Sequence, residues 1–479
     1  MKSRNKYFVF HTGIGILFSL VFPGPCKSNP PQDSSRPPNI IFILADDLGY
    51  GALGCYGQEK IQTPNIDRLA AEGMKFTQAY AGSHSCAPSR SVLMTGLHTG
   101  HTPVRGGRRG EHLLDEDVTV AEVLKQAGYT TSAFGKWGLG LEGSPGHPNR
   151  QGFDEFFGYL HQVHAHFYHP YFLWRNEAKF YLRENEGKKQ VRYAHDEIHA
   201  QAMDFIARNR ARPFFAYIPY TLPHTEIVVP EDSVQPYRGK FIEEPLPDHR
   251  PGYKGADEPY ATYAGMISRL DRHVGEIMAR LKRLGIDEET VVFFSSDNGP
   301  QGKAWQRVTD FFDGNGPLRG YKAQFYEGGI RVPLVVSWPG KIAAGSESHL
   351  ATAFWDFLPT AAELAGVEIS LPVDGISIVP TLTGSGEPQA THAFLFWEFA
   401  NAQITSRAAR MGKWKGVQST SDSPWELYDL EKDPEESNNI IQEHPEIVEE
   451  IDAYIVNART ERRSYPVPKE SPTAATYVR

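Results

Sequence analysis

Three short apolar runs, each followed by polar residues, constrain the fold of this chain most strongly. They cover residues 39–45, 213–218 and 290–295. Continuous apolar runs of this length are typical of strands that are buried on both faces, as in a parallel sheet covered by helices. The long segments between them carry helical patterns, notably over 195–208 and 260–284. We therefore predict an α/β fold with a large, mostly parallel mixed sheet flanked by helices, and a smaller C-terminal α+β subdomain.

Candidate metal ligands follow the first and third of these runs. Asp46 and Asp47 come directly after the first, and Asp297 and Asn298 come after the third. In open α/β sheets, sites form where the carboxyl ends of strands meet. An Asp-Asp pair in a turn is often only solvated, but two such strand ends in one chain favour a site. Ligand sets made only of oxygen select Ca²⁺ or Mg²⁺ over zinc.

The segment 85–96 predicts a loop that runs into a helix and stops at Gly96. Cys86 lies at or just before the start of this helix. Backbone N–H groups and the helix dipole favour an anion or a thiolate at that position. Arg90, about one turn further on, can face the same anion. A lone cysteine is more often a buried structural residue, so this segment needs independent support.

That support is a resemblance to a known family. The order C-x-P-S-R-x4-T-G over residues 86–96 resembles the signature of the type I sulfatases, in the alkaline-phosphatase superfamily. The resemblance implies that a formylglycine-generating maturation enzyme oxidises Cys86 to Cα-formylglycine, whose hydrate attacks a sulfate ester. It also implies one Ca²⁺, with Mg²⁺ less favoured, whose ligands would be Asp46, Asp47, Asp297, Asn298 and the modified Cys86.

Further blocks of the chain resemble the same family. Lys136, in the run G-K-W-G-L-G over 135–140, matches a lysine that contacts the sulfate, and Lys322 matches a second one. His224, after the second apolar run, matches a histidine that contacts the substrate and the leaving oxygen. The resemblance implies that Arg90 holds the hydrate. The predicted catalytic residues are therefore Cys86, Arg90, Lys136, His224 and Lys322.

One position departs from the family pattern. Gly138 stands where the family usually has a histidine, a candidate proton acceptor. Four histidines follow shortly afterwards, and we predict that one of them fills the space beside Gly138: His161, His164, His166 or His169. The alternative is that water or Asp297 takes the proton and the histidines line a sugar pocket or are structural. A zinc cluster is disfavoured, because the segment lacks cysteine or carboxylate partners.

The predicted function is the hydrolysis of sulfate esters by an arylsulfatase-like enzyme. The aromatic region 153–174 resembles sulfatases that act on sulfated carbohydrate. Two alternatives remain open: a phosphate or phosphonate ester hydrolase of the same superfamily, and a non-catalytic sulfoglycan-binding protein if Cys86 is unmodified. A net charge of −9 argues against nucleic-acid partners.

The N-terminus has the pattern of a secretory signal. Basic residues at positions 2, 4 and 6 precede an apolar run over 8–22. We expect an exported protein, periplasmic or secreted. Cys26 leaves the alternative of a lipoprotein, the only case in which we expect membrane association. The predicted parts are a signal peptide (1–28), a tether (29–37), the catalytic α/β domain (38–384), the C-terminal α+β subdomain (385–465) and a tail (466–479).

Overall fold

The three apolar runs form neighbouring strands at the centre of a large sheet. The computed structural model describes residue 1 and residues 36–106, 110–187, 189–248, 253–400 and 405–465, and within this part of the chain the sheet has 10 strands. In their order across the sheet they are β11 (Ser346–Ser348), β2 (Met74–Phe76), β10 (Leu334–Ser337), β9 (Thr290–Ser296), β1 (Asn39–Ala45), β8 (Phe214–Pro219), β4 (Thr130–Lys136), β5 (Glu155–Tyr159), β6 (Phe172–Arg175) and β7 (Ala178–Tyr181).

The middle of this sheet is parallel and its margins are mixed. β9, β1, β8, β4 and β5 run parallel to one another. Antiparallel pairing extends the sheet through β10 on one side and through β6 and β7 on the other. The predicted fold class, a mostly parallel mixed sheet, is therefore confirmed.

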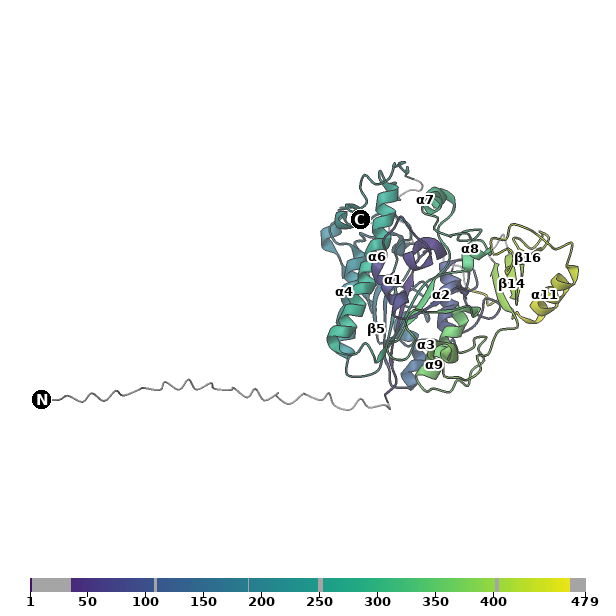
Figure 1. The fold of residues 1–479 in the computed structure, drawn as a ribbon, viewed down its shortest axis with the longest axis horizontal. Coiled ribbons are helices and arrows are strands. Elements are labelled where there is room, and N and C mark those ends of the chain that lie inside the picture. Colours follow the sequence, from purple (N-terminus) through teal and green to yellow (C-terminus); the bar gives the residue numbers. More distant parts are fainter. Residues whose placement is uncertain (2–35, 107–109, 188, 249–252, 401–404, 466–479) are drawn as a thin grey trace. The chain divides into compact units, whose positions relative to one another are not determined.

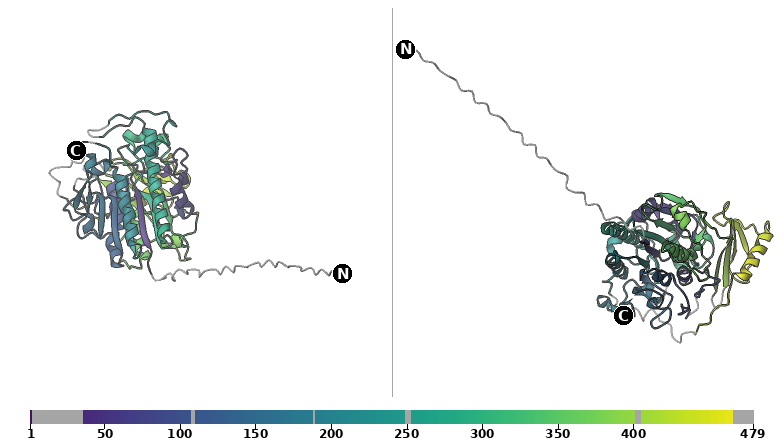
Figure 2. Two further views of the ribbon diagram at one scale, coloured as in Figure 1. Left: turned by 90° about the vertical axis from the view of Figure 1, so that its left-hand side faces the viewer. Right: turned by 90° about the horizontal axis from the view of Figure 1, so that it is seen from below.

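Helices cover both faces of the sheet. α2 (Cys86–Thr95), α3 (Val120–Gln126) and α9 (Phe357–Leu364) pack on one face, and α1 (Pro64–Ala71), α4 (Ala194–Asn209) and α6 (Pro259–Leu284) pack on the other (Figure 1). Alternate residues of β1 supply both cores: Ile40 and Phe42 face the first set, and Ile41 and Ile43 face the second. The long helices α4 and α6 lie side by side, as Figure 2 shows.

Shorter elements connect these layers. The short helices are α5 (Glu231–Val234), α7 (Gln306–Phe311), α8 (Glu327–Ile330) and α10 (Val379–Thr383), and β3 (Ala79–Tyr80) pairs with β12 (Thr352–Ala353). α5 and an isolated bridge between Leu246 and Ala256 lie in the segment 226–257.

The strand register decides which side chains meet at the carboxyl edge of the sheet. Ala45 of β1 pairs with Ser296 of β9, so Asp46 and Asp297, one residue further on, leave the sheet at matching positions. Lys136 is the last residue of β4, which is separated from β1 only by β8. One edge of the sheet therefore gathers acidic and basic side chains from distant parts of the sequence.

The C-terminal part forms a second, smaller sheet. β13 (Leu395–Ala400), β14 (Thr405–Met411), β15 (Trp414–Gln418) and β16 (Glu426–Asp429) are antiparallel, and α11 (Pro445–Asn457) packs against them through Ile451 and Ile455. The indole of Trp397 donates a hydrogen bond to the carbonyl of Ala81, with N···O 2.9 Å, and so joins this sheet to the segment that follows β3. The predicted small α+β subdomain is confirmed as a fold class.

Several predictions concern residues outside those described. The predicted signal peptide, most of the tether, Cys26 and the tail over 466–479 belong to this group. Every helix among the described residues is too short or too polar to cross a membrane.

Candidate active site

Four of the five predicted metal ligands lie buried together at the carboxyl edge of the sheet. Asp46, Asp47, Asp297 and Asn298 are all buried. Ligand atoms of Asp46, Cys86 and Asp297 lie within 4.8 Å of one another. The same limit holds for the group of Asp46, Asp47 and His224. The structure therefore brings together residues that the sequence placed at separate strand ends.

Three cationic side chains neutralise these carboxylates. The Arg90 guanidinium donates from Nε and Nη2 to Asp297 Oδ2, with N···O distances of 3.0 and 2.7 Å. Lys136 Nζ lies 2.7 Å from Asp46 Oδ2, and both side chains are fully buried. Lys322 Nζ lies 2.7 Å from Asp47 Oδ1. Each predicted cation is thus paired with a different predicted carboxylate.

The surroundings shift the pKa values of several of these groups. Burial would lower the pKa of the Lys322 ammonium, but Asp47 and the other anionic groups raise it above its ordinary value. The Arg90 guanidinium behaves in the same way: burial would lower its pKa, but Asp297 and the other anionic groups around it together raise it. Burial and the neighbouring Asp46 raise the pKa of the Asp297 carboxyl despite the nearby cations. Lys322 and Arg90 therefore remain charged where an anion would bind.

Two buried oxygens at this edge suit a cation. Asp46 Oδ1 and Asn298 Oδ1 have no hydrogen-bond partner among the described residues. A buried acceptor without a partner is costly, and a hard cation would satisfy both. Asp47 holds a left-handed backbone conformation, with φ 63°, and its N–H donates to Asp297 Oδ1 at 3.1 Å. The chemistry of the donor set therefore fits Ca²⁺ or Mg²⁺.

His224 lies beside Asp47, on the loop that follows β8. The hydroxyl of Tyr168 donates to the carbonyl of His224, at 2.8 Å, and orders this loop. His224 Nδ1 donates to the carbonyl of Thr225 at 2.9 Å, and Nε2 lies 3.3 Å from Asp47 Oδ2. Burial, with Lys322, Lys136 and His166 nearby, holds the pKa of the imidazole well below its ordinary value. A neutral ring therefore directs the lone pair of Nε2 towards the carboxylates.

Cys86 lies between the buried charged side chains of the site and the solvent. It is the first residue of α2, and Gly96 ends this helix with φ 69°, as predicted. The Cys86 thiol donates to Gln162 Oε1, with an S···O distance of 3.4 Å. Cys86, Gln162, His166 and Lys322 are all partly exposed. These residues form the accessible rim of the site.

The space beside Gly138 is filled by Gln162 and not by a histidine. A Cβ added to Gly138 would lie 1.9 Å from Gln162 Nε2, and the three nearest heavy atoms all belong to Gln162. The prediction that an imidazole occupies this space is therefore wrong. The reason is the backbone: Trp137 N donates to the carbonyl of Tyr159 and Gly138 N to that of Leu160, which sets Gln162 opposite the glycine.

The four histidines occupy other positions. His161 Nδ1 accepts a hydrogen bond from the N–H of Val163. His164 packs between the rings of Tyr159 and Phe172. His169 packs against Tyr193. His166 lies nearest to the site, because its ring stacks on that of His224 with a centroid distance of 4.5 Å.

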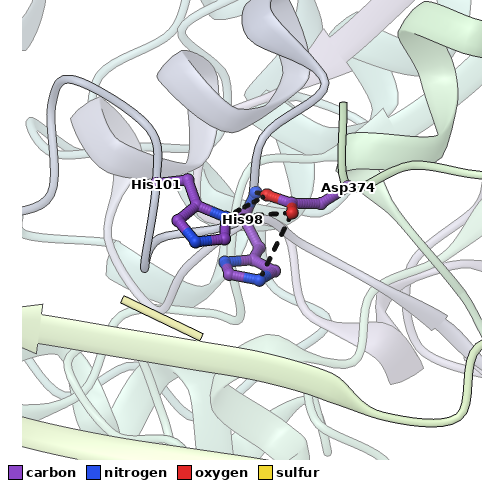
Figure 3. A group of neighbouring side chains, drawn as sticks. All are labelled: His98, His101 and Asp374. Atoms are coloured by element: carbon purple, nitrogen blue, oxygen red, sulfur yellow. Dashed lines mark hydrogen bonds and ion pairs between the residues drawn. The ribbon is translucent and has the colours of Figure 1, made fainter. Parts of the chain in front are cut away.

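A second group of possible metal ligands lies in the loop after α2. His98, His101 and Asp374 converge in Figure 3, and His101 Nδ1 lies 2.9 Å from Asp374 Oδ1. His98 Nδ1 accepts a hydrogen bond from the N–H of Gly100 at 3.1 Å. A metal-bound imidazole donates from its other nitrogen, which His98 cannot do in this arrangement. We therefore interpret this group as a hydrogen-bonded link between the loop and the segment around Asp374.

Sequence analysis missed two residues that contact the predicted site. Gln301 Nε2 donates to Asp47 Oδ2, and Gln162 contacts Cys86. The position of Gln162 follows from the parallel pairing of β4 with β5 in the structure. Lys136 pairs with Tyr159 in that register, so the residues that follow Tyr159 lie beside Gly138, which has no side chain to fill the space. Glutamines carry no motif that would have singled either of them out.

Similarity to known proteins extends over most of the chain. The sulfatase family model matches residues 38–367, and a model for the C-terminal part of N-sulphoglucosamine sulphohydrolase matches residues 320–461. Arylsulfatase A of Homo sapiens is 34% identical over 460 residues, which cover 85% of this chain and 84% of that protein. N-acetylgalactosamine-6-sulfatase of Canis lupus familiaris is 31% identical, covering 87% of this chain and 78% of that protein. The crystal structure of Ps i-CgsB in complex with k-i-k-neocarrahexaose superposes with a TM-score of 0.76 at 27% identity, over 91% of this chain and 96% of that chain.

Proposed function

Because the chain belongs to the sulfatase family and is a sulfuric ester hydrolase, we propose that it removes sulfate from sulfated carbohydrates at the site around Cys86. The observation that carries this proposal is the meeting of Cys86 with three cation–carboxylate pairs, whose carboxylates are all buried, at one sheet edge. Support for a carbohydrate substrate comes from the similarity to N-acetylgalactosamine-6-sulfatase and to a structure that holds an oligosaccharide.

The cationic side chains would receive the sulfate group. A sulfate monoester carries a negative charge that repels anionic nucleophiles, so a site must neutralise it before attack. Lys136 and Lys322 come from separate elements and present ammonium groups to this region. Their attraction for the sulfate would be stronger here than in water, because the site is largely buried. We assign to these two lysines the binding of the sulfate oxygens.

The proposal includes a bound divalent cation and a modified side chain at position 86. Asp46, Asp47, Asp297, Asn298 and residue 86 would hold one Ca²⁺, or less favourably Mg²⁺. Such a cation supplies charge neutralisation and lowers the pKa of a hydroxyl bound to it. Oxidation of Cys86 by a formylglycine-generating enzyme would supply a hydrated aldehyde as the nucleophile. The position of Cys86 at the start of α2 favours a nucleophile with anionic character.

Arg90 and His224 complete the proposed machinery. Arg90 Nη1 also donates to the carbonyl of Lys136, so the guanidinium is fixed on two sides beside residue 86. We assign to Arg90 the orientation of the modified side chain. His224 lies across the carboxylates from Cys86, and we assign to it contact with the leaving oxygen. From its N-terminal pattern we further propose that the protein is exported, to the periplasm or beyond the cell.

Matched esters test this proposal. The full chain is produced together with a formylglycine-generating enzyme, and hydrolysis of sulfate and phosphate esters of the same alcohol is compared, with sulfated monosaccharides as further substrates. We expect sulfate release at the higher rate, and none from Cys86→Ala. Preferential phosphate release, or sulfate release by Cys86→Ala, would contradict the proposal.

A further inference from the structure

We propose that Gln162 is a positioning residue of this site: its amide takes the place of the side chain absent at Gly138, holding residue 86 through Oε1 and offering Nε2 to a sulfate oxygen. The inference rests on the proposed function, because it names a group that would contact the sulfate. Three observations on the described residues carry it.

Gln162 and a side chain at position 138 exclude each other. The Cβ position of Gly138 lies 1.9 Å from Gln162 Nε2, far inside van der Waals contact. Gly138 also has φ +79°, a conformation that favours glycine. The backbone hydrogen bonds from Trp137 and Gly138 to the carbonyls of Tyr159 and Leu160 hold the two segments in this register. The glycine therefore makes room for the glutamine.

The amide of Gln162 is directed at residue 86. The Cys86 thiol donates to Gln162 Oε1 at 3.4 Å, and in the matured protein an oxygen of the modified side chain would stand in place of this sulfur. A hydroxyl can donate to the same carbonyl oxygen. Oε1 can therefore fix the orientation of the modified side chain.

The amide nitrogen of Gln162 is an unsatisfied hydrogen-bond donor. Gln162 Nε2 is buried and has no hydrogen-bond partner among the described residues. Leaving an amide N–H₂ group buried without an acceptor costs free energy that a bound acceptor would recover. A sulfate oxygen is such an acceptor, and it would lie near residue 86 during reaction. Gln162 Nε2 would thus add a neutral donor to the charges of Lys136 and Lys322.

An amide restricts what Gln162 can do. It neither gains nor loses a proton near neutral pH, so it cannot serve as a general base, as an imidazole at position 138 could. Its contribution is to bind and orient. We therefore expect this site to show the loss of sulfate affinity, and not a new pH dependence, when Gln162 is changed.

Sulfate affinity tests the proposal without relying on turnover. Inorganic sulfate is titrated into the matured full chain by calorimetry, after mass spectrometry has confirmed equal modification of residue 86 in each variant. In Gln162→Met, which keeps the volume but has no donor, we expect affinity to fall roughly tenfold to a hundredfold, the usual effect of removing a hydrogen bond to a charged group. Gln162→Glu should bind sulfate more weakly still, because it adds a negative charge.

A matched control separates this role from a general need for the glutamine. Gln389 has hydrogen bonds to Ser377 and Thr381 in its own segment. Gln389→Met should leave sulfate affinity unchanged. Sulfate binding by Gln162→Met at wild-type affinity, with the chain folded and modified, would overturn the inference.

A double-mutant cycle provides a second test. Gly138→Ala should displace the Gln162 amide and lower sulfate affinity, as Gln162→Ala does. Because both changes remove the same group, their effects should not add, and the backbone strain at position 138 is common to both backgrounds. Additive losses would overturn the inference. A wild-type chain that is modified, binds sulfate and hydrolyses no sulfate ester would contradict the proposed function, while the order of sulfate affinities would still decide the role of Gln162.

Discussion

Lys415 offers a quantitative test of how the C-terminal sheet supports the active site. Its ammonium lies 2.8 Å from Glu327 Oε1 and 2.9 Å from Glu436 Oε1, and all three side chains are fully buried. Glu327 begins α8, five residues after Lys322 in the sequence. The Lys415→Met substitution keeps the volume of the side chain and leaves two buried carboxylates without their shared cation.

The expected loss in the free energy of unfolding for Lys415→Met follows from this geometry. Removing one partner of a buried ion pair costs about 3–5 kcal/mol. The pKa of Glu327 shifts in the corresponding direction: burial would raise it, but Lys415, with Arg331 and Arg410, lowers it from 4.5 to about 2. Burial and the neighbouring Glu327 raise the pKa of Glu436 to about 7.

The sign of the pH dependence follows from these directions. In the wild type, the contribution of Glu327 is fully present above its ordinary pKa and is lost progressively as the pH falls from about 4.5 to about 2. Without Lys415, burial and the neighbouring Glu327 would raise the pKa of Glu436 further, so Glu436 would gain a proton more readily in the folded state than in the unfolded state. The variant should therefore lose more stability at pH 8 than at pH 5.5, where protonation removes part of the buried charge.

The assay is equilibrium unfolding in urea at both pH values. The control is Lys413→Met, because Lys413 pairs with Asp429 while its own side chain is 33% exposed, and such pairs contribute less than about 1 kcal/mol. A loss below 1 kcal/mol for Lys415→Met at pH 8, or an equal loss at both pH values, would refute the reasoning.

Three further predictions concern the site itself. Asp297→Asn should lose both activity and bound divalent cation, and unchanged metal content by elemental analysis would argue against the ligand assignment. Exhaustive chelation should abolish sulfate release and added Ca²⁺ should restore it, whereas full activity without any divalent cation would exclude a metal role. Lys322→Met should lower kcat/KM for a sulfate ester by roughly tenfold or more, as expected when a charged donor to the substrate is removed; wild-type kinetics would remove Lys322 from the sulfate-binding set.

Local patterns were enough to predict the main elements of the fold. The apolar runs became β1, β8 and β9, and the helical patterns over 195–208 and 260–284 became α4 and α6. These features are encoded by neighbouring residues, because burial on both faces and helical periodicity leave direct marks in the sequence. The short helix α5 was missed, since four residues are too few for a periodic signal.

The site was predictable where its residues end strands or match a family motif. Asp46, Asp297 and Lys136 met as expected because parallel strands end at a common edge. The filling of the space beside Gly138 was not predictable in the same way. It depends on the register of β4 and β5, which sets Gln162 and not a histidine opposite the glycine. The register in which two distant segments pair is not determined by the sequence of either segment alone.

The central claim is that modified Cys86 performs sulfate-ester hydrolysis. The most direct test is the mass of the peptide that contains residue 86, measured on a preparation whose rate of sulfate release is known. The account predicts an aldehyde or its hydrate in place of the thiol, with a rate of sulfate release that rises in proportion to the modified fraction. An unmodified Cys86 thiol in a preparation that hydrolyses sulfate esters at full rate would contradict it.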